Sequence, residues 1–377
     1  MHKYVKTTIR FRLSCIRRAS NNFFKELRIG ILILLVSIIS LLLVVCVEAL
    51  TTPTSTPEVK AASPSQPLSG PGGADYKHAG VTVSGYGKGE NQYWIFEPAS
   101  PTPESAPLIV FNHGLGVLNP VTYGAWIEHL VRHGNIVVYP RYQAYFFMPA
   151  SEIIQTSQNP IIAVKDAIER LQSGEHVIPQ LDKFAIVGHS LGAAITANMA
   201  SRAASEGLPE PKAIMAVCPP IHEAAYRNLS QIPATTLLLV VVCQEDRVTP
   251  PICGLKIFYG TPQIPVTNKD FITFVSDYHG EPPLIADHFA PVAPDERYNV
   301  QDMVPVLTQI QRGVEQMTGT SIDALDYGLW KLFDGLTDSA FYNKNWEYAL
   351  GNTTEQRFMG EWSDGTPVIE LEVSDSP

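Results

Sequence analysis

The chain has 377 residues, of which 45% are hydrophobic and 17% are charged, and its formal net charge is −10. This length and apolar content are enough for one large domain with a hydrophobic core and additional segments. Residues 1–28 hold eight Lys or Arg side chains against a single acid, Glu26, so the rest of the chain is strongly acidic. An acidic body of this kind excludes nucleic acid as an expected partner.

An uncharged apolar run follows the basic segment. As a helix rising ~1.5 Å per residue, residues 29–47 would span about 30 Å, the thickness of the hydrocarbon core of a bilayer. We therefore predict a basic cytoplasmic segment, 1–28, and a single-pass transmembrane signal anchor, 29–47. The basic flank places the body of the protein outside the cytoplasm, at the cell membrane. The alternative is a secreted protein whose signal peptide is cleaved near Ala49.

The remaining chain divides by composition into three parts. Residues 48–75 are rich in Pro, Ser and Thr and predict a solvated linker. The predicted folded body, 76–300, begins with two short strands near 81–86 and 92–97. A C-terminal extension, 301–377, either packs on this body or caps its site. Apolar side chains near helical spacing occur in the extension at Ile322, Leu325, Leu329, Leu332 and Leu336.

From residue 108 onward, apolar runs typical of strands alternate with segments typical of helices. The predicted strands are residues 108–111, 135–139, 184–187, 212–217, 235–242 and 271–275, the last of the sheet. The predicted helices are residues 123–132, a segment capped by Asn159 and opened by Pro160, and residues 193–204. This alternation predicts an α/β fold, a mostly parallel central sheet with helices on both faces. Ligands of such sheets bind at the carboxyl ends of the strands.

A candidate nucleophile lies between a predicted strand and a predicted helix. Gly188-His189-Ser190-Leu191-Gly192 matches the pattern G-x-S-x-G. A serine on such a sharp turn projects its hydroxyl clear of the backbone, beside the free N–H groups of the helix N-terminus. We predict that Ser190 is the nucleophile and that His189 packs within the turn. The alternative is an ordinary strand-to-helix turn that carries a surface serine.

The turn of residues 112–116, Asn-His-Gly-Leu-Gly, directly follows the first core strand. A Gly-flanked turn at a strand end can direct a backbone N–H into the site, where it stabilises the oxyanion of acyl transfer. We predict an oxyanion hole formed by the backbone N–H groups of Leu115 and Leu191. The alternative is a plain loop whose glycines serve only steric needs.

The acid and the base follow from chain order. Asp246 lies a few residues past a strand end, where a carboxylate can orient a histidine, and Glu245 is its nearest rival. Hydrolases with this elbow have the order Ser, acid, His, and only His279 and His288 follow Asp246. We predict His288, because a loop beyond the last strand can swing an imidazole over the serine.

Three cysteines lie near these candidates. Cys243 and Cys253 bracket Asp246 and could form a disulfide outside the cytoplasm, and Cys218 could pair with Cys243 instead. Free buried thiols are the third possibility. Because no His/Cys cluster has zinc spacing and no glycine-rich loop fits a phosphate, we expect neither a metal nor a cofactor.

These motifs carry resemblances to known families. The elbow with Asp246 and His288 resembles the α/β-hydrolase superfamily. Residues 288–291, His-Phe-Ala-Pro, resemble the catalytic-histidine loop of actinobacterial cutinase-type polyester hydrolases. Residues 110–116 and 133–138 resemble the platelet-activating-factor acetylhydrolases, and dienelactone-hydrolase-like proteins share the general layout. The resemblance covers most of the predicted body and implies an α/β-hydrolase fold with serine esterase activity.

The sequence therefore predicts a membrane-anchored serine esterase acting on a small-molecule or lipid-like ester. Ser190 attacks the carbonyl, His288 transfers the proton and Asp246 orients His288. Two other hypotheses remain open: an amidase or peptidase on the same fold, and a hydrolase fold that serves as a binding module without turnover.

Overall fold

Nine strands form one mixed sheet in the computed structural model, which describes residues 60–143, 157–220, 226–300 and 325–377. The strands are β1 (Gly80–Tyr86), β2 (Tyr93–Ala99), β3 (Ser105–Asn112), β4 (Ile136–Pro140), β5 (Ile178–His189), β6 (Pro211–Val217), β7 (Leu237–Cys243), β8 (Lys269–Phe274) and β9 (Glu372–Ser374). Their order in the sheet is β1-β2-β4-β3-β5-β6-β7-β8-β9. The pairings from β4 to β8 are parallel, and the pairings β1–β2, β2–β4 and β8–β9 are antiparallel.

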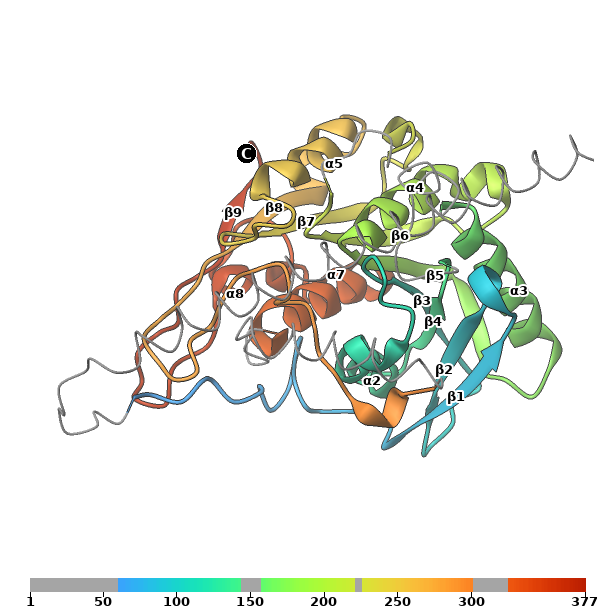
Figure 1. Ribbon diagram of the computed structural model, residues 1–377, viewed down its shortest axis with the longest axis horizontal. Helices are drawn as coiled ribbons and strands as arrows, with labels where there is room; N and C mark the ends of the chain where they lie inside the picture. The colour runs from blue at the N-terminus through green and yellow to red at the C-terminus, as the bar shows by residue number, and fades with distance from the viewer. Residues whose placement is uncertain (1–59, 144–156, 221–225, 301–324) are drawn as a thin grey trace, which may run out of the picture. The chain divides into compact units, whose positions relative to one another are not determined.

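Helices cover both faces of this sheet (Figure 1). One face carries α2 (Gly124–Arg132) and α7 (Lys331–Tyr342), and the other carries α3 (Asn159–Ser173), α4 (Leu191–Glu206) and α5 (Leu255–Gly260). A further short helix, α8 (Thr354–Arg357), follows α7. The predicted mostly parallel sheet with helices on both faces is confirmed, and the arrangement is α/β-hydrolase-like.

The strands serve two separate cores because successive side chains of a strand point to opposite faces. On β5, Ala185 and Val187 pack in the core under α2 and α7, whereas Phe184 and Ile186 pack in the core under α3 and α4. All four are fully buried. Strands buried on both faces have no polar side for alternation, which explains why they occur in the sequence as continuous apolar runs.

The site candidates meet where neighbouring strands send their connections to opposite faces. Strands β3 and β5 are adjacent and parallel. The chain leaves β3 toward α2 on one face and leaves β5 directly into α4 on the other. Such a switch point at the carboxyl ends of the strands is the usual ligand position in open α/β sheets.

The described part of the predicted C-terminal extension forms a layer of the domain. Leu332, Phe333 and Leu336 of α7 are completely buried, and they share one core with Trp126 and Leu130 of α2. Helix α7 thus packs on the sheet face at β5 and β6. The segment 301–324 of the predicted extension lies outside the described residues, so whether the extension also caps the site stays a prediction.

Two details of the predicted elements are wrong. The sheet does not end at β8, because β9 pairs with it through Glu372–Ser374, a stretch too short and too polar to be recognised. Asn159 does not cap α3, since Gln158 occupies the cap position and Asn159 is the first helical residue. The Asn159 side chain instead donates a hydrogen bond to the Tyr142 carbonyl (3.1 Å).

The N-terminal boundary of the body also differs from its predicted position at residue 76. Ala61 is buried in the core under α7, and the Ala62 backbone exchanges hydrogen bonds with Ser363. The predicted cytoplasmic segment and signal anchor, 1–47, lie outside the described residues. Within the ranges that are described, no helix is long and apolar enough to cross a bilayer.

Candidate active site

Ser190 occupies a strained turn between β5 and α4. Its backbone has φ 56° and ψ −122°, a conformation that residues with a Cβ rarely adopt and that is characteristic of functional sites. Flanking glycines make the turn possible, because a Cβ on Gly188 would lie 2.3 Å from the Gly192 carbonyl oxygen. A Cβ on Gly192 would lie 2.1 Å from the Asn112 carbonyl oxygen. The sequence therefore forces a close approach of β5, α4 and the end of β3 at Ser190.

Hydrogen bonds connect the three residues predicted to act together. The Ser190 Oγ lies 3.0 Å from His288 Nε2, and His288 Nδ1 lies 2.7 Å from Asp246 Oδ2. The carboxylate can only accept, so in the neutral imidazole Nδ1 carries the proton and Nε2 accepts from the serine hydroxyl. His288 and Asp246 are buried, whereas Ser190 remains partly exposed. This arrangement leaves the serine hydroxyl accessible and the histidine fixed in one tautomer.

Asp246 is held in place by the loop that follows β7. Its Oδ1 accepts hydrogen bonds from the Val248 N–H (2.8 Å) and the Thr249 N–H (2.7 Å), which is an Asx-type turn. The Thr249 hydroxyl lies 2.8 Å from Asp246 Oδ2 and 2.9 Å from the Cys218 carbonyl oxygen. Thr249 was not among the predicted site residues. The spacing Asp-x-x-Thr after a strand end is the local signal that could have identified it.

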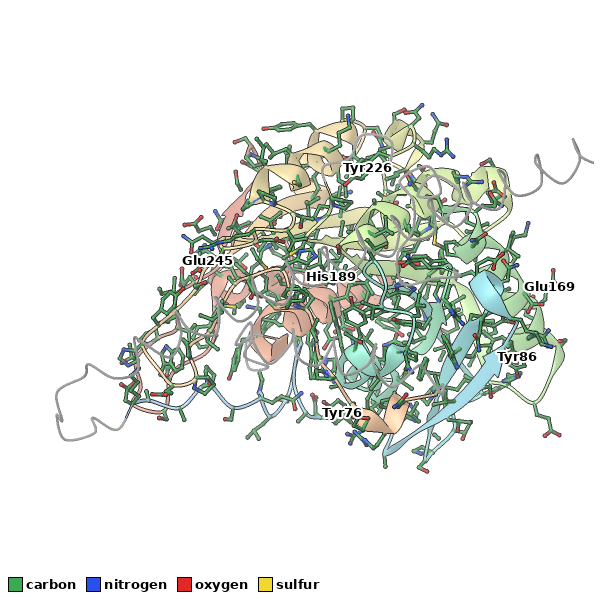
Figure 2. The ribbon with its side chains drawn as sticks, in the orientation of Figure 1. Tyr76, Tyr86, Glu169, His189, Tyr226 and Glu245 are labelled. Atoms are coloured by element: carbon green, nitrogen blue, oxygen red, sulfur yellow. The ribbon has the colours of Figure 1, made fainter. Side chains whose placement is uncertain are left out.

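The rival acid and the rival base lie elsewhere in hydrogen-bonded pairs of their own. Glu245 bonds the Tyr278 hydroxyl, and its position toward the β8–β9 side is labelled in Figure 2. His279 Nε2 lies 2.7 Å from Asp364 Oδ2, with 40% of the His279 side chain exposed. Neither side chain meets Ser190. The geometry therefore groups Asp246 and His288 with the serine, as the chain order predicts.

The electrostatics of the pair favour a charged histidine. Burial lowers the pKa of His288, but the hydrogen bond to Asp246 and the neighbouring Cys218 outweigh it and raise the pKa to about 9. Burial raises the pKa of Asp246, yet His288 and the Thr249 hydrogen bonds bring it below its ordinary value. A carboxylate that stays ionised beside the ring can stabilise the imidazolium that forms when Ser190 loses its proton.

The turn after β3 lies against Ser190. A Cβ on Gly114 would lie 3.5 Å from the Ser190 Cβ and 3.3 Å from the Tyr123 hydroxyl, which places this turn in close contact with the serine. Leu191 is the first residue of α4, and neither its N–H nor the Leu115 N–H has an acceptor among the described residues. These are the two groups predicted to form the oxyanion hole. Beside them, the Gly116 N–H bonds Gln143 Oε1 (2.9 Å).

Three cysteines near the site are free thiols. Cys218, Cys243 and Cys253 are buried, and the sulfurs of Cys218 and Cys243 are 3.6 Å apart, in hydrogen-bonding contact. Of the three predicted alternatives, the described residues have the free-thiol form. The side-chain hydrogen bond to Cys243 and burial both raise the pKa of Cys218, whereas the neighbouring His288 lowers it.

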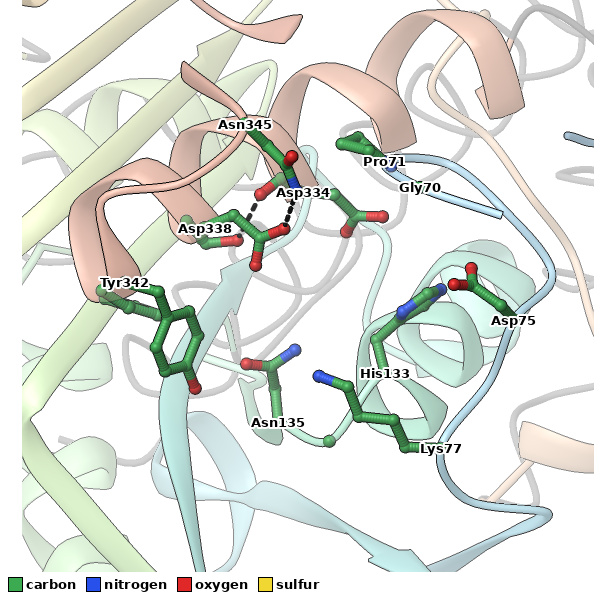
Figure 3. Close-up of a pocket in the computed structure, with 13 residues that line it drawn as sticks. Gly70, Pro71, Asp75, Lys77, His133, Asn135, Asp334, Asp338, Tyr342 and Asn345 are labelled. Carbon is green, nitrogen blue, oxygen red and sulfur yellow. Dashed lines mark hydrogen bonds between the residues drawn. The ribbon is translucent and has the colours of Figure 1, made fainter. Parts of the chain in front are cut away.

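Two groups of side chains bring possible metal ligands within 4.8 Å of one another in the described part of the chain. One is His189, Cys218 and His288 at the site, and the other is His129, His133 and Asp334 between α2 and α7. The second group borders a cavity of about 160 Å³, to which His133 and Asp334 contribute (Figure 3). In this group, His129 Nε2 is bonded to Asp334 and His133 Nε2 to the Gly73 carbonyl. These nitrogens are engaged in a hydrogen-bonded network of the protein.

A family comparison covers the nucleophile side of this site. Residues 87–228 match the family model of Chlorophyllase. The match runs from before β2 to beyond β6 and includes the predicted oxyanion turn and Ser190. Asp246 and His288 lie after its end, so the comparison is silent on the acid and the base. No curated protein matches the chain.

Proposed function

We propose that the protein is a serine hydrolase that cleaves carboxylic esters through a covalent acyl-enzyme. The observation that carries this proposal is the hydrogen-bond chain Ser190–His288–Asp246, at a strained turn on the carboxyl edge of a parallel sheet. Nucleophile, base and orienting carboxylate in this order are the arrangement that activates a serine hydroxyl. The Chlorophyllase match over residues 87–228 supports the same reaction class.

The proposed reaction uses only groups of this chain. Ser190 Oγ attacks the ester carbonyl while His288 Nε2 takes the serine proton, and Nδ1–H stays bonded to Asp246. The carbonyl oxygen becomes an oxyanion, which the Leu115 and Leu191 N–H groups stabilise. His288 then protonates the leaving alcohol. Water attacks the acyl-enzyme by the reverse sequence of proton transfers and releases the acid.

The same comparison supports a substrate class. The name Chlorophyllase points to an ester such as chlorophyll, and a lipid-like ester of this type is the substrate we propose to test first. No redox or group-transfer cofactor is required to balance ester hydrolysis. An amide substrate remains the competing hypothesis, because the same serine chemistry cleaves amides.

We also propose that the enzyme is attached to a membrane by residues 29–47, with its catalytic domain outside the cytoplasm. The support is the uncharged apolar run and the eight basic side chains that precede it. The full chain should then fractionate with membranes and resist carbonate extraction. A soluble protein that begins at Leu50 would show signal cleavage instead and refute the anchor.

A substrate panel tests the reaction itself. The chain should hydrolyse nitrophenyl esters of graded acyl length, and chlorophyll in detergent, but the matching nitroanilides much more slowly. The Ser190→Ala variant should hydrolyse none of them above background. Preferred cleavage of the anilides would establish the amidase alternative, and a folded protein inactive on every ester would refute the proposal.

A further inference from the structure

A chain of three hydrogen bonds links the three segments that surround Ser190. The Gly114 N–H lies 3.1 Å from Tyr123 Oη, and Tyr123 Oη lies 2.8 Å from His189 Nδ1. His189 Nε2 lies 2.8 Å from the His288 carbonyl oxygen. Gly114 belongs to the turn after β3, His189 ends β5, and His288 lies in the loop beyond β8. These segments are far apart in sequence, and this chain of side chains adds a second connection to the direct contacts that they make around Ser190.

The direction of each hydrogen bond is fixed by the groups that take part. A carbonyl oxygen can only accept, so His189 Nε2 must carry the proton that it donates to His288. In a neutral ring, Nδ1 then has a lone pair and accepts from the Tyr123 hydroxyl. The same hydroxyl oxygen accepts the Gly114 N–H. Every donor thus meets an acceptor, and the direction runs from Gly114 through Tyr123 and His189 to His288.

The side chains of this hydrogen-bond chain are buried and uncharged. Tyr123 is fully buried and His189 is 4% exposed. Burial and the neighbouring His288 lower the pKa of His189 well below its ordinary value. His189 is therefore neutral at neutral pH, which is the state that the direction of the hydrogen bonds requires. Its position near the middle of the ribbon is labelled in Figure 2.

This hydrogen-bond chain joins two segments whose relative position matters for the proposed reaction. Gly114 precedes Leu115, whose N–H is proposed to bind the oxyanion, and the His288 carbonyl belongs to the proposed base. A shift of about 1 Å between such groups costs on the order of 10²-fold in rate. Two side chains that set the spacing between these segments would thus influence turnover without touching the substrate.

We infer that Tyr123 and His189 are positioning residues, which hold the oxyanion turn and the His288 loop at the separation that ester hydrolysis needs. This inference rests on the proposed function. If these two side chains served only to pack the core, removing a single polar atom from either one would leave kcat unchanged. The centre of the His189 ring also lies 4.8 Å from that of the His288 ring. Experiments must therefore distinguish the effect of ring packing on kcat from the effect of the His189 hydrogen bonds.

Three single variants of the full chain separate the hydrogen bonds from the packing. Tyr123→Phe removes only the hydroxyl and should lower kcat on the order of 10²-fold with KM within about twofold. His189→Gln keeps an N–H donor near the position of Nε2, whereas His189→Asn keeps a polar atom only near Nδ1. We therefore expect His189→Gln to retain more kcat than His189→Asn. Nitrophenyl acetate serves as the substrate.

A double variant tests whether the two residues act as one unit. In Tyr123→Phe/His189→Gln, the loss of kcat should be smaller than the product of the two single losses, because either change breaks the same Tyr123–His189 bond. Multiplicative losses would show two independent effects and contradict a continuous chain of hydrogen bonds. Thermal unfolding curves give the fraction of each variant that is folded under the assay conditions. Each kcat is then expressed per folded molecule.

Ser190→Ala measured in parallel distinguishes the failure of this inference from the failure of the proposed function. Wild-type activity in Ser190→Ala would refute the proposed function itself. An inactive Ser190→Ala together with undiminished kcat in Tyr123→Phe and both His189 variants would refute the positioning role alone. If a His189 variant fails to fold, Tyr123→Phe still decides, since it changes a single atom of a buried ring.

Discussion

The described residues include two buried His–Asp pairs with nearly equal N···O distances. His288 Nδ1 lies 2.7 Å from Asp246 at the carboxyl edge of the sheet, and His129 Nε2 lies 2.8 Å from Asp334 between α2 and α7. The other nitrogen of each ring meets a hydroxyl. For His288 that hydroxyl is Ser190, and for His129 it is Tyr76, 3.2 Å from Nδ1.

The two pairs differ in charge and in what surrounds the hydroxyl. The pKa of His288 is raised, whereas burial lowers the pKa of His129, whose ring is stacked on Trp330. Asp334 also accepts the Gly72 N–H, which ties the N-terminal segment to α7 beside the cavity of Figure 3. A His–Asp pair is therefore not a site by itself. The partly exposed serine on a strained turn makes the first pair a candidate for catalysis, and the second pair joins packed layers.

The largest expected effect is the loss of the nucleophile or the base. Ser190→Ala and His288→Ala should each lower kcat on the order of 10⁴–10⁶-fold. Catalytic residues that act as a unit are non-additive, so the loss of one costs about as much as the loss of all. Steady-state hydrolysis of a nitrophenyl ester measures this, with unfolding curves as a check on folding. Activity that disappears in His279→Ala but survives in His288→Ala would reverse the assignment of the base.

Matched substitutions of the two carboxylates compare the pairs directly. Asp246→Asn should lower kcat on the order of 10⁴-fold, since the amide no longer fixes the tautomer or balances the imidazolium. Asp334→Asn should leave kcat unchanged and lower the free energy of unfolding by about 2 kcal/mol, the scale of a charge-assisted hydrogen bond. Both quantities come from the same preparations. Equal losses of kcat would show that the comparison is wrong.

The parts of the site that short sequence motifs mark could be predicted from the sequence. The elbow around Ser190 is one short motif, and Asp246 follows a strand end at a typical distance. His288 came from chain order, a property of the whole fold. Tyr123 and the α2–α7 network were beyond reach, because their partners lie far away in sequence and no spacing marks them. The three-residue strand β9 has no pattern of its own and exists only because β8 offers it an edge.

The pH dependence of kcat/KM should also distinguish the two His–Asp pairs, with a smaller effect than the substitutions above. His288 must be neutral to accept the serine proton, so kcat/KM should rise as pH increases toward its pKa of about 9. Asp246→Asn removes the carboxylate that raises this pKa and should move the rise to lower pH. In Asp334→Asn the rise should stay where it is in the wild type. A profile that moves with Asp334 but not with Asp246 would contradict our assignment.

The smallest expected effect on chemistry comes from the layer that contains the second pair. Leu336 of α7 is fully buried against the sheet, and Leu336→Ala should lower the free energy of unfolding by about 2–5 kcal/mol through the cavity it leaves. At a temperature where the variant is folded, kcat should equal that of the wild type. Denaturant titration and ester hydrolysis measure the two properties. A tenfold loss of kcat at full folding would mean that α7 takes part in the site.

The central claim is that Ser190 is an activated nucleophile, and covalent labelling tests it most directly. The full chain is treated with a fluorophosphonate, digested, and analysed by mass spectrometry for the peptide that contains Ser190. We predict one adduct, on Ser190, which forms much more slowly in His288→Ala and at the wild-type rate in Asp334→Asn. A folded protein that remains unlabelled at Ser190, or one whose labelling rate is the same in His288→Ala, would contradict the account.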